Sequence, residues 1–311
     1  MMKLLLLKEQ IVKVYNRNEV FITPIIKTLI ALIVISVINV QLGYLSVLNN
    51  MLIVMMAALM CSFMPYSFIT AMAAIFALGH FYALGIEAAG FAMVGFLLVY
   101  LLLVRFVAKE KIIVVILPIL MALKIPYFIP VVLGLIGTPF SIVSVSCGVI
   151  VYYIALNISN NAQILASLNS DDAIQKVKIL VDTILNDKAM IITIIALSAT
   201  VIVVYTIRRL AIDNCWTIAM CAGYAINLMV LVTGDLAYKT DISIVVVIIM
   251  SIVSFVITKI VEFFIFNIDY SRVEKVQFED DDYYYYVKAV PKIKLNETNK
   301  KVKKINSVRR K

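Results

Sequence analysis

Long runs of hydrophobic residues, separated by short polar turns, cover most of the chain between residues 23 and 266. Runs of about 20 apolar residues are long enough to cross a bilayer as helices. The pattern predicts an all-α integral membrane protein with about ten transmembrane helices. The full-length runs are 23–48, 66–84, 87–107, 139–157, 190–207, 216–233 and 242–266.

Three further apolar runs, 51–64, 112–123 and 126–136, are short for a hydrocarbon core of about 30 Å. Proline lies in or beside each of them and removes a backbone donor. Broken backbone at membrane depth must be covered by protein or must line a wet cavity, because lipid offers no hydrogen-bond partner. The broken-helix positions are Pro65, Pro118, Pro126, Pro130 and Pro139.

Two of the short runs end in similar sequences, LMCSFMPY at 59–66 and LMALKIPY at 120–127. This similarity favours an inverted repeat, an arrangement that places binding sites near the bilayer midplane in many transporters. The alternative is that Leu, Met, Pro and Tyr are simply common in such segments.

The distribution of Lys and Arg predicts the orientation of the chain. If 112–123 and 126–136 each cross, every basic cluster falls on one side, which the positive-inside rule assigns to the cytoplasm. A single kinked span over 112–136 would separate the clusters. We therefore expect a plasma-membrane protein with both termini cytoplasmic, although the sequence does not decide whether the two segments each cross.

The same reading divides the chain into three parts. Residues 1–22 read as an interfacial amphipathic helix, and 23–266 as the transmembrane domain. Within that domain, 159–188 is an extracytoplasmic insertion whose Ile174, Val177, Val181, Ile184 and Leu185 share one helical face, with Ser170 or Asp171 as its cap. Residues 267–311 form a cytoplasmic tail.

Composition excludes most other classes of protein. The chain is 63% hydrophobic and 15% charged with a mean hydropathy of +1.01, against about 25% charge in soluble domains. It has one histidine and four cysteines, with no metal-ligand spacing and no catalytic or nucleotide-binding motif. We expect no enzyme activity, no cofactor, no metal and no nucleic-acid partner; if nucleotide energy is used, another subunit supplies it.

The candidate intramembrane polar site consists of His80 within the run 66–84, Glu87 at the start of the run 87–107, and Lys124 at the junction of the two short runs. His80 and Glu87 are seven residues apart, so a continuous helix would place them on nearly the same face, as a proton relay requires. The alternative is a hydrogen-bonded histidine and a carboxylate at headgroup level. Lys124 either snorkels to the interface or binds an anionic group.

The tail combines an acidic run, a tyrosine run and a basic end. The tyrosines and the alternation after them favour an extended strand, which needs a partner because a lone strand is unstable in water. We expect it to dock a cytoplasmic protein or an energising subunit, and the basic C-terminus to bind anionic lipid. The docking residues are Tyr283, Tyr284, Tyr285, Tyr286, Val287 and Pro291.

The segment FEDDDYYYYVKAVPK resembles the ending of an uncharacterised group of multi-pass membrane proteins of clostridia and related Firmicutes. The resemblance covers about 20 residues from Val273 onward. It implies a Gram-positive plasma membrane and carries no functional residue to this chain.

Two functions fit these features. The first is a permease-like transport component with its cavity at the proline-rich segments. The second is a membrane scaffold or assembly subunit that docks a partner through its tail. A lipid-acting enzyme ranks third. Broken helices at membrane depth favour transport, because a mere anchor has no need of them.

Overall fold

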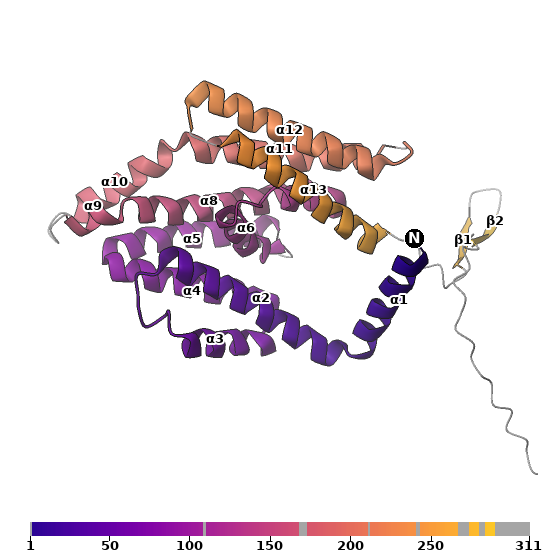
Figure 1. Ribbon diagram of the computed structural model, residues 1–311, viewed down its shortest axis with the longest axis horizontal. Coiled ribbons are helices and arrows are strands. Elements are labelled where there is room, and N and C mark those ends of the chain that lie inside the picture. Colours follow the sequence, from indigo (N-terminus) through magenta and orange to yellow (C-terminus); the bar gives the residue numbers. More distant parts are fainter. Residues whose placement is uncertain are drawn as a thin grey trace, which may run out of the picture. The chain divides into compact units, whose positions relative to one another are not determined.

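A computed structural model describes residues 2–107, 110–167, 173–210, 212–240, 243–266, 274–279 and 284–289. The chain forms a helical body, residues 19–261, and a second unit that joins residues 1–18 to residues 262–311. The helices of the body (Figure 1) are α2 (Glu19–Leu42), α3 (Met51–Phe63), α4 (Tyr66–Leu84), α5 (Ile86–Phe106), α6 (Ile113–Ala122), α7 (Phe128–Ile136), α8 (Ser141–Asn160), α9 (Ala162–Ser167), α10 (Ala173–Leu185), α11 (Lys188–Arg208), α12 (Cys215–Tyr238) and most of α13 (Ile244–Phe266).

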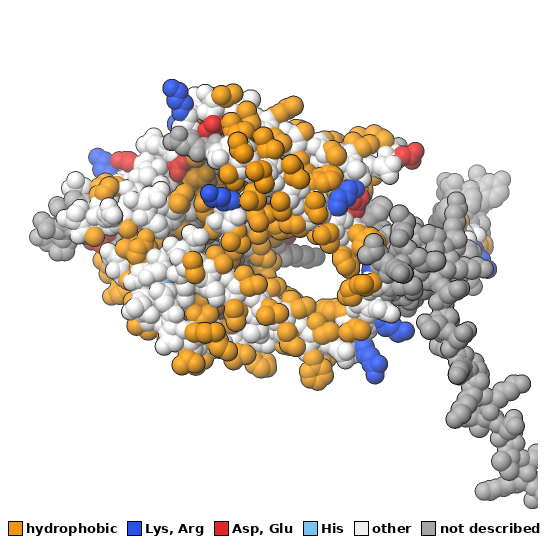
Figure 2. All heavy atoms as spheres, in the orientation of Figure 1, with side chains coloured by type: hydrophobic (Ala, Val, Ile, Leu, Met, Phe, Trp, Pro, Cys, Tyr) orange, Lys and Arg blue, Asp and Glu red, His pale blue; other side chains and the backbone are white. Residues whose placement is uncertain are grey.

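The predicted all-α fold is confirmed. Within the described residues, seven helices are long and apolar enough to cross a membrane, namely α2, α4, α5, α8, α11, α12 and α13. Hydrophobic side chains are spread over the whole face of the body shown in Figure 2. Val40 and Phe63 are 83% and 87% exposed, which is costly in water and natural in lipid. The body is compatible with a multi-pass membrane protein.

The helices run back and forth between two ends of the body. At one end Lys27 Nζ donates to the Met64 carbonyl (3.0 Å), the Thr70 hydroxyl donates to the Lys111 carbonyl (3.5 Å), and Lys259 Nζ donates to Thr217 (2.7 Å). We call this the basic end, defined by Lys27, Lys111, Arg208 and Lys259. The opposite end carries α10 in the part of Figure 1 at the left, and we call it the α10 end.

The first long helix is placed differently from its prediction. The predicted span of 23–48 begins earlier, at Glu19, and ends earlier, at Leu42. Gly43 stops it with φ of +61°, a left-handed conformation that glycine adopts without strain. Asn50 then caps α3 by accepting from the Leu52 amide (3.0 Å).

Helices α6 and α7 form a hairpin that is too short to cross a membrane twice. At 1.5 Å per residue they are about 15 Å and 13 Å long. Lys124, with φ of +62°, joins them: its amide bonds the Met121 carbonyl and the Ile125 amide bonds the Leu120 carbonyl. This is a Schellman turn, which ends α6 at Ala122.

Both ends of the hairpin lie at the basic end. Thr70 at the start of α4 contacts Lys111 just before α6, and Arg208 at the end of α11 donates to the Leu135 and Gly137 carbonyls at the end of α7. The hairpin therefore begins and ends at the same end of the body. This keeps the up-and-down order that ten crossings would give.

The two similar sequences do not lead into similar structures. Pro65 is extended and caps the full-length α4, whereas the segment at 120–127 contains the left-handed Lys124 and leads into the nine-residue α7. The inverted repeat is not confirmed and stays a prediction.

The predicted face of α10 agrees only in part with the packed one: Ile184 packs against the body as expected. Ile174 and Leu185, expected on the apolar face, are 87% and 68% exposed. Leu180 and Lys176 are buried instead, and Leu180 packs with residues of α4, α5 and α8. The predicted caps Ser170 and Asp171 lie outside the described residues.

The second unit contains α1 (Met2–Arg17), the end of α13, and strands β1 (Glu274–Glu279) and β2 (Tyr284–Ala289). Lys8 Nζ donates to the Phe263 carbonyl at 3.4 Å. The strand expected in the tail is present as β2. It pairs with β1 of the same chain in an antiparallel arrangement, with Glu274 opposite Ala289. Tyr283, Pro291 and the basic C-terminus lie outside the described residues.

Candidate binding cavity

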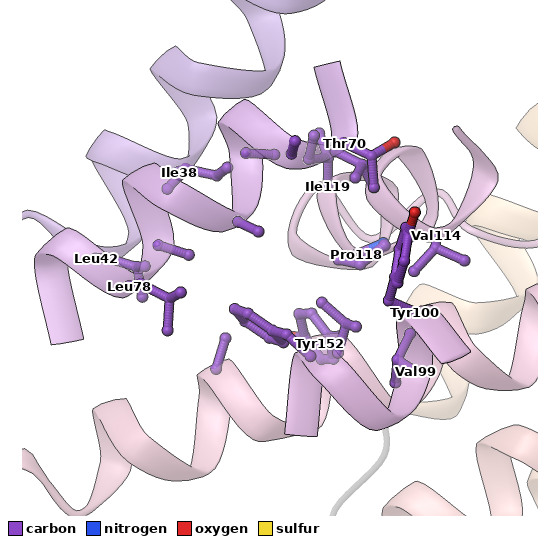
Figure 3. Close-up of a pocket in the computed structure, with 18 of the residues that line it drawn as sticks. Ile38, Leu42, Thr70, Leu78, Val99, Tyr100, Val114, Pro118, Ile119 and Tyr152 are labelled. Atoms are coloured by element: carbon purple, nitrogen blue, oxygen red, sulfur yellow. The ribbon is translucent and has the colours of Figure 1, made fainter. Parts of the chain in front are cut away.

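A half-open cavity of about 540 Å³ lies between α2, α4, α5, α6 and α8. This volume is within the usual range of about 300–1,000 Å³ for small-molecule sites. Most of the lining is aliphatic or aromatic, and small alanines of α4 leave the space between the helices. Figure 3 shows side chains from these helices converging on it, including Ile38, Leu78 and Tyr152.

Polar groups are gathered near the two ends of the cavity. At the basic end the lining includes Ser67, Thr70, Tyr100 and Lys111. The Lys111 ammonium lies 5.3 Å from the centroid of the Tyr100 ring, a cation–π distance. Figure 3 shows the Thr70 and Tyr100 hydroxyls on the side of Val114 and Pro118, away from Leu42 and Leu78.

Toward the α10 end the polar lining residues are Gln41 and Ser159. Ser159 is close to the last residue of α8, whereas the first turn of α8 contacts Glu110 at the basic end: the Ser141 hydroxyl donates to its carboxylate at 2.8 Å. From Ser141 to Ser159 the helix rises by roughly 27 Å. The cavity thus runs along the helices, apolar in its middle and polar toward both ends.

The proline positions divide between the cavity and the helix starts. Pro118 lies within α6 and lines the cavity, while Pro126 and Pro130 are buried in the hairpin. Pro65 and Pro139 are exposed and precede α4 and α8. The structure therefore brings one of the five predicted positions to the cavity.

His80 is fully buried at the end of α4. The Leu45 amide donates to its Nδ1 at 3.1 Å, so Nδ1 is an acceptor and the proton resides on Nε2, which donates to Asn39 Oδ1 at 2.9 Å. Asn39 in turn donates to the Leu48 carbonyl at 2.6 Å. The ring holds the turn between α2 and α3 against α4.

Glu87 has a different partner from the one that the relay requires. Its carboxylate lies 3.6 Å from Lys176 Nζ on α10, and both side chains are nearly buried, at 13% and 10% exposure. Glu87 is also in the first turn of α5, where the helix dipole favours a negative charge. The pair fastens α10 to the body, and the structure does not bring His80 and Glu87 into one network.

The Glu87–Lys176 pair predicts a double-mutant result. Glu87→Gln and Lys176→Met are each expected to lower the free energy of unfolding by about 1–3 kcal/mol, because each leaves a buried charge alone. Exchanging the charges, Glu87→Lys with Lys176→Glu, should recover only part of this loss, since lysine opposes the α5 dipole. Thermal unfolding in mild detergent measures each change.

The exposed Lys178 on the same helix is the control for this pair. Lys178→Met should change stability by about 0.5 kcal/mol at most. Equal losses for Lys176→Met and Lys178→Met would show that the pair does not hold α10.

Lys124 does not lie at the cavity. It is exposed at the turn of the α6–α7 hairpin. Its positive φ and its turn hydrogen bonds give it a structural role at that point.

The structure also shows polar residues that sequence reasoning missed. Asn227 of α12 is fully buried, and its amide has no hydrogen-bond partner in the described structure; the same holds for the hydroxyls of Ser251 and Ser254 on α13. Glu110 and Arg208 fasten the ends of the hairpin and α8. In the sequence, Asn227, Ser251 and Ser254 are recognisable only as polar residues within apolar runs.

Within the described residues, no group of three or more His, Cys, Asp or Glu side chains is arranged to hold a metal ion. Comparisons with known proteins complete the picture: no family model matches the chain, and neither a curated protein nor a solved structure matches it significantly. Function is therefore inferred from the geometry of the chain itself.

Proposed function

We propose that the chain is a multi-pass plasma-membrane protein with a permease-like body that carries an apolar or amphipathic solute in its cavity. The observation that supports this proposal best is the cavity itself. It is of ligand size, lined by five helices, and it has polar groups near both ends of the body. A protein that only anchors a tail has no need of such a space.

The proposed topology has both termini in the cytoplasm and α10 outside. Three observations support it: the antiparallel order of the helices, the return of the α6–α7 hairpin to one end, and the larger number of cations at the basic end. There Arg105 and Arg209 add to Lys27, Lys111, Arg208 and Lys259, against Lys176, Lys178, Lys188 and Lys239 at the α10 end. The positive-inside rule then assigns the basic end to the cytoplasm.

Single cysteines would test this topology. In a background without the native cysteines, Ser167→Cys in α9 is expected to react with a membrane-impermeant maleimide in intact cells. Asp213→Cys, between α11 and α12, should react only after permeabilisation. Labelling of both positions from outside, or the reverse pattern, would overturn the proposed orientation.

Transport is tested with the purified full-length chain in liposomes. Fluorescent single-chain amphiphiles that dithionite bleaches from outside report movement between leaflets. Wild-type protein is expected to accelerate bleaching over protein-free liposomes, and Ala74→Phe, which fills the cavity from α4, should abolish the acceleration. Equal rates for wild-type and protein-free liposomes would contradict a permease.

A scaffold is the second candidate function, and the β1–β2 hairpin favours it. Tyr286 and Val287 of β2 are 76% and 46% exposed, and two strands alone are marginally stable. The hairpin offers edges to which a partner's sheet could add. Deleting residues 274–311 would abolish function in a scaffold and leave solute movement intact in a permease.

A further inference from the structure

We propose that the occupant of the cavity is a single-chain amphiphile with an anionic headgroup, held with the headgroup at Lys111 and the chain along α4 and α5. This inference rests on the proposed cavity function and names the class of its ligand. Neither composition nor motif suggests it; it depends on how the structure distributes charge along the cavity.

The charge of Lys111 is the first reason to expect an anionic headgroup in the cavity. Among the described residues, no carboxylate lies within ion-pair distance of its Nζ. Its neighbour in sequence, Glu110, is instead engaged by the Ser141 and Ser144 hydroxyls at 2.8 and 3.0 Å. Lys111 therefore brings an uncompensated positive charge to the cavity wall, where an anionic group would be held by charge-assisted hydrogen bonds.

The ring and hydroxyl groups around Lys111 are the second reason to expect an anionic headgroup. The Tyr100 ring lies beside the ammonium, and Ser67 of α4 adds a hydroxyl to the same end of the lining. The Thr70 hydroxyl donates to the Lys111 carbonyl and so holds the lysine beside α4. A carboxylate or phosphate accepts from ammonium and hydroxyl donors together. We therefore predict an anionic oxygen headgroup, either a carboxylate or a phosphate, and both kinds of probe are tested.

The apolar middle of the cavity is the reason to expect an alkyl chain behind the headgroup. Beyond Tyr100 the α5 lining consists of Met93, Phe96 and Leu97, and α4 contributes alanines and Leu78. Burying a methylene there gains about 0.8 kcal/mol. The lining on α4 extends from Ser67 to Leu78, a rise of roughly 16 Å, which suits one extended chain lying parallel to the helices.

Site-specific quenching tests the proposal. With Trp216 replaced by Phe, a tryptophan is placed either in the cavity, Phe96→Trp, or on the exposed surface of α5, Leu98→Trp, which does not line it. The protein is held in nanodiscs of neutral phosphatidylcholine at mildly alkaline pH. Dibrominated stearate, a brominated long-chain alkyl phosphate and the neutral dibrominated stearyl alcohol are then titrated as quenchers.

We expect saturable quenching of the Phe96→Trp protein by both anionic probes, and only gradual quenching of the Leu98→Trp protein as the probes enter the bilayer. Lys111→Met should raise the half-saturating concentration of the anionic probes by about tenfold, which corresponds to about 1.4 kcal/mol. Lys111→Met should leave the half-saturating concentration of the neutral probe unchanged. Lys27→Met, at the same end but outside the cavity lining, is the matched control and should change neither.

Three outcomes would overturn the proposal. The first is equal quenching of the two tryptophans, which would mean partition into bulk lipid. The second is equal affinity for neutral and anionic probes in the wild type. The third is an equal effect of Lys111→Met and Lys27→Met. Because binding is measured here and movement in the liposome assay, bound but unmoved amphiphile would leave the ligand class standing and remove the permease.

Discussion

Arg208→Ala is expected to lower the free energy of unfolding by roughly 2–6 kcal/mol, since it leaves two backbone carbonyls without a donor at about 1–3 kcal/mol each. The Arg208 guanidinium donates to the Leu135 and Gly137 carbonyls, the latter at 2.8 Å. These carbonyls end α7, a short helix that cannot satisfy them internally. Thermal unfolding in detergent, monitored as the loss of monodisperse protein with rising temperature, measures the change.

The adjacent Arg209 is a matched control. It donates to the Tyr205 hydroxyl at 2.9 Å on the exposed surface, so Arg209→Ala should cost at most about 0.5 kcal/mol. Arg208→Lys should fall between the two, because an ammonium cannot span both carbonyls as the guanidinium fork does. Similar losses for Arg208→Ala and Arg209→Ala would show that the hairpin does not depend on this contact.

Gly223→Ala is expected to destabilise the body by about 1–3 kcal/mol, because the added methyl group overlaps a packed neighbour. An ideal Cβ at Gly223 lies 2.4 Å from Cγ2 of Val204, on the facing surface of α11. Gly134 of α7 contacts the same valine, and its Cβ would lie 2.7 Å from Val204 Cβ and 3.1 Å from the Val201 carbonyl oxygen. Small residues allow these helices to approach closely.

The two glycines differ in how far Val204→Ala should offset their loss of stability. That change removes Cγ2, so it should offset part of the Gly223→Ala loss, with a coupling of about 0.5–3 kcal/mol. At Gly134 it removes Cγ1, 2.8 Å from the added Cβ, but retains Val204 Cβ at 2.7 Å and the Val201 carbonyl oxygen at 3.1 Å, so Gly134→Ala should recover less. The control is Gly90→Ala, since a Cβ there meets nothing within 4 Å. Equal rescue of both glycines would contradict the packing described for α11.

Much of the candidate site was out of reach of sequence reasoning. Pro118 was predicted at a broken helix and lines the cavity, whereas His80, Glu87 and Lys124 each have another position or partner. Lys111 was read only as one charge of a basic cluster. Its neighbours Thr70 and Tyr100 come from other helices, and their proximity follows from packing alone.

The sequence by itself determined the class of the protein and the positions of its helices. Apolar runs of membrane length predict where helices form, because each run must satisfy its own backbone hydrogen bonds in lipid. The run at 66–84 became α4 with the predicted bounds. The end of α2 escaped prediction, because the apolar letters after Leu42 continue while Gly43 turns the chain.

Only the tertiary structure decided which polar residues meet. Glu87 selects Lys176 on α10, Arg208 caps α7 across more than 70 residues of chain, and the tail strand pairs with a segment that precedes it. Hydrophobic runs predict which segments form helices in lipid, but the choice among distant polar partners depends on helix packing. That packing is set by side-chain shape, as at Gly134 and Gly223 around Val204, which hydropathy does not encode.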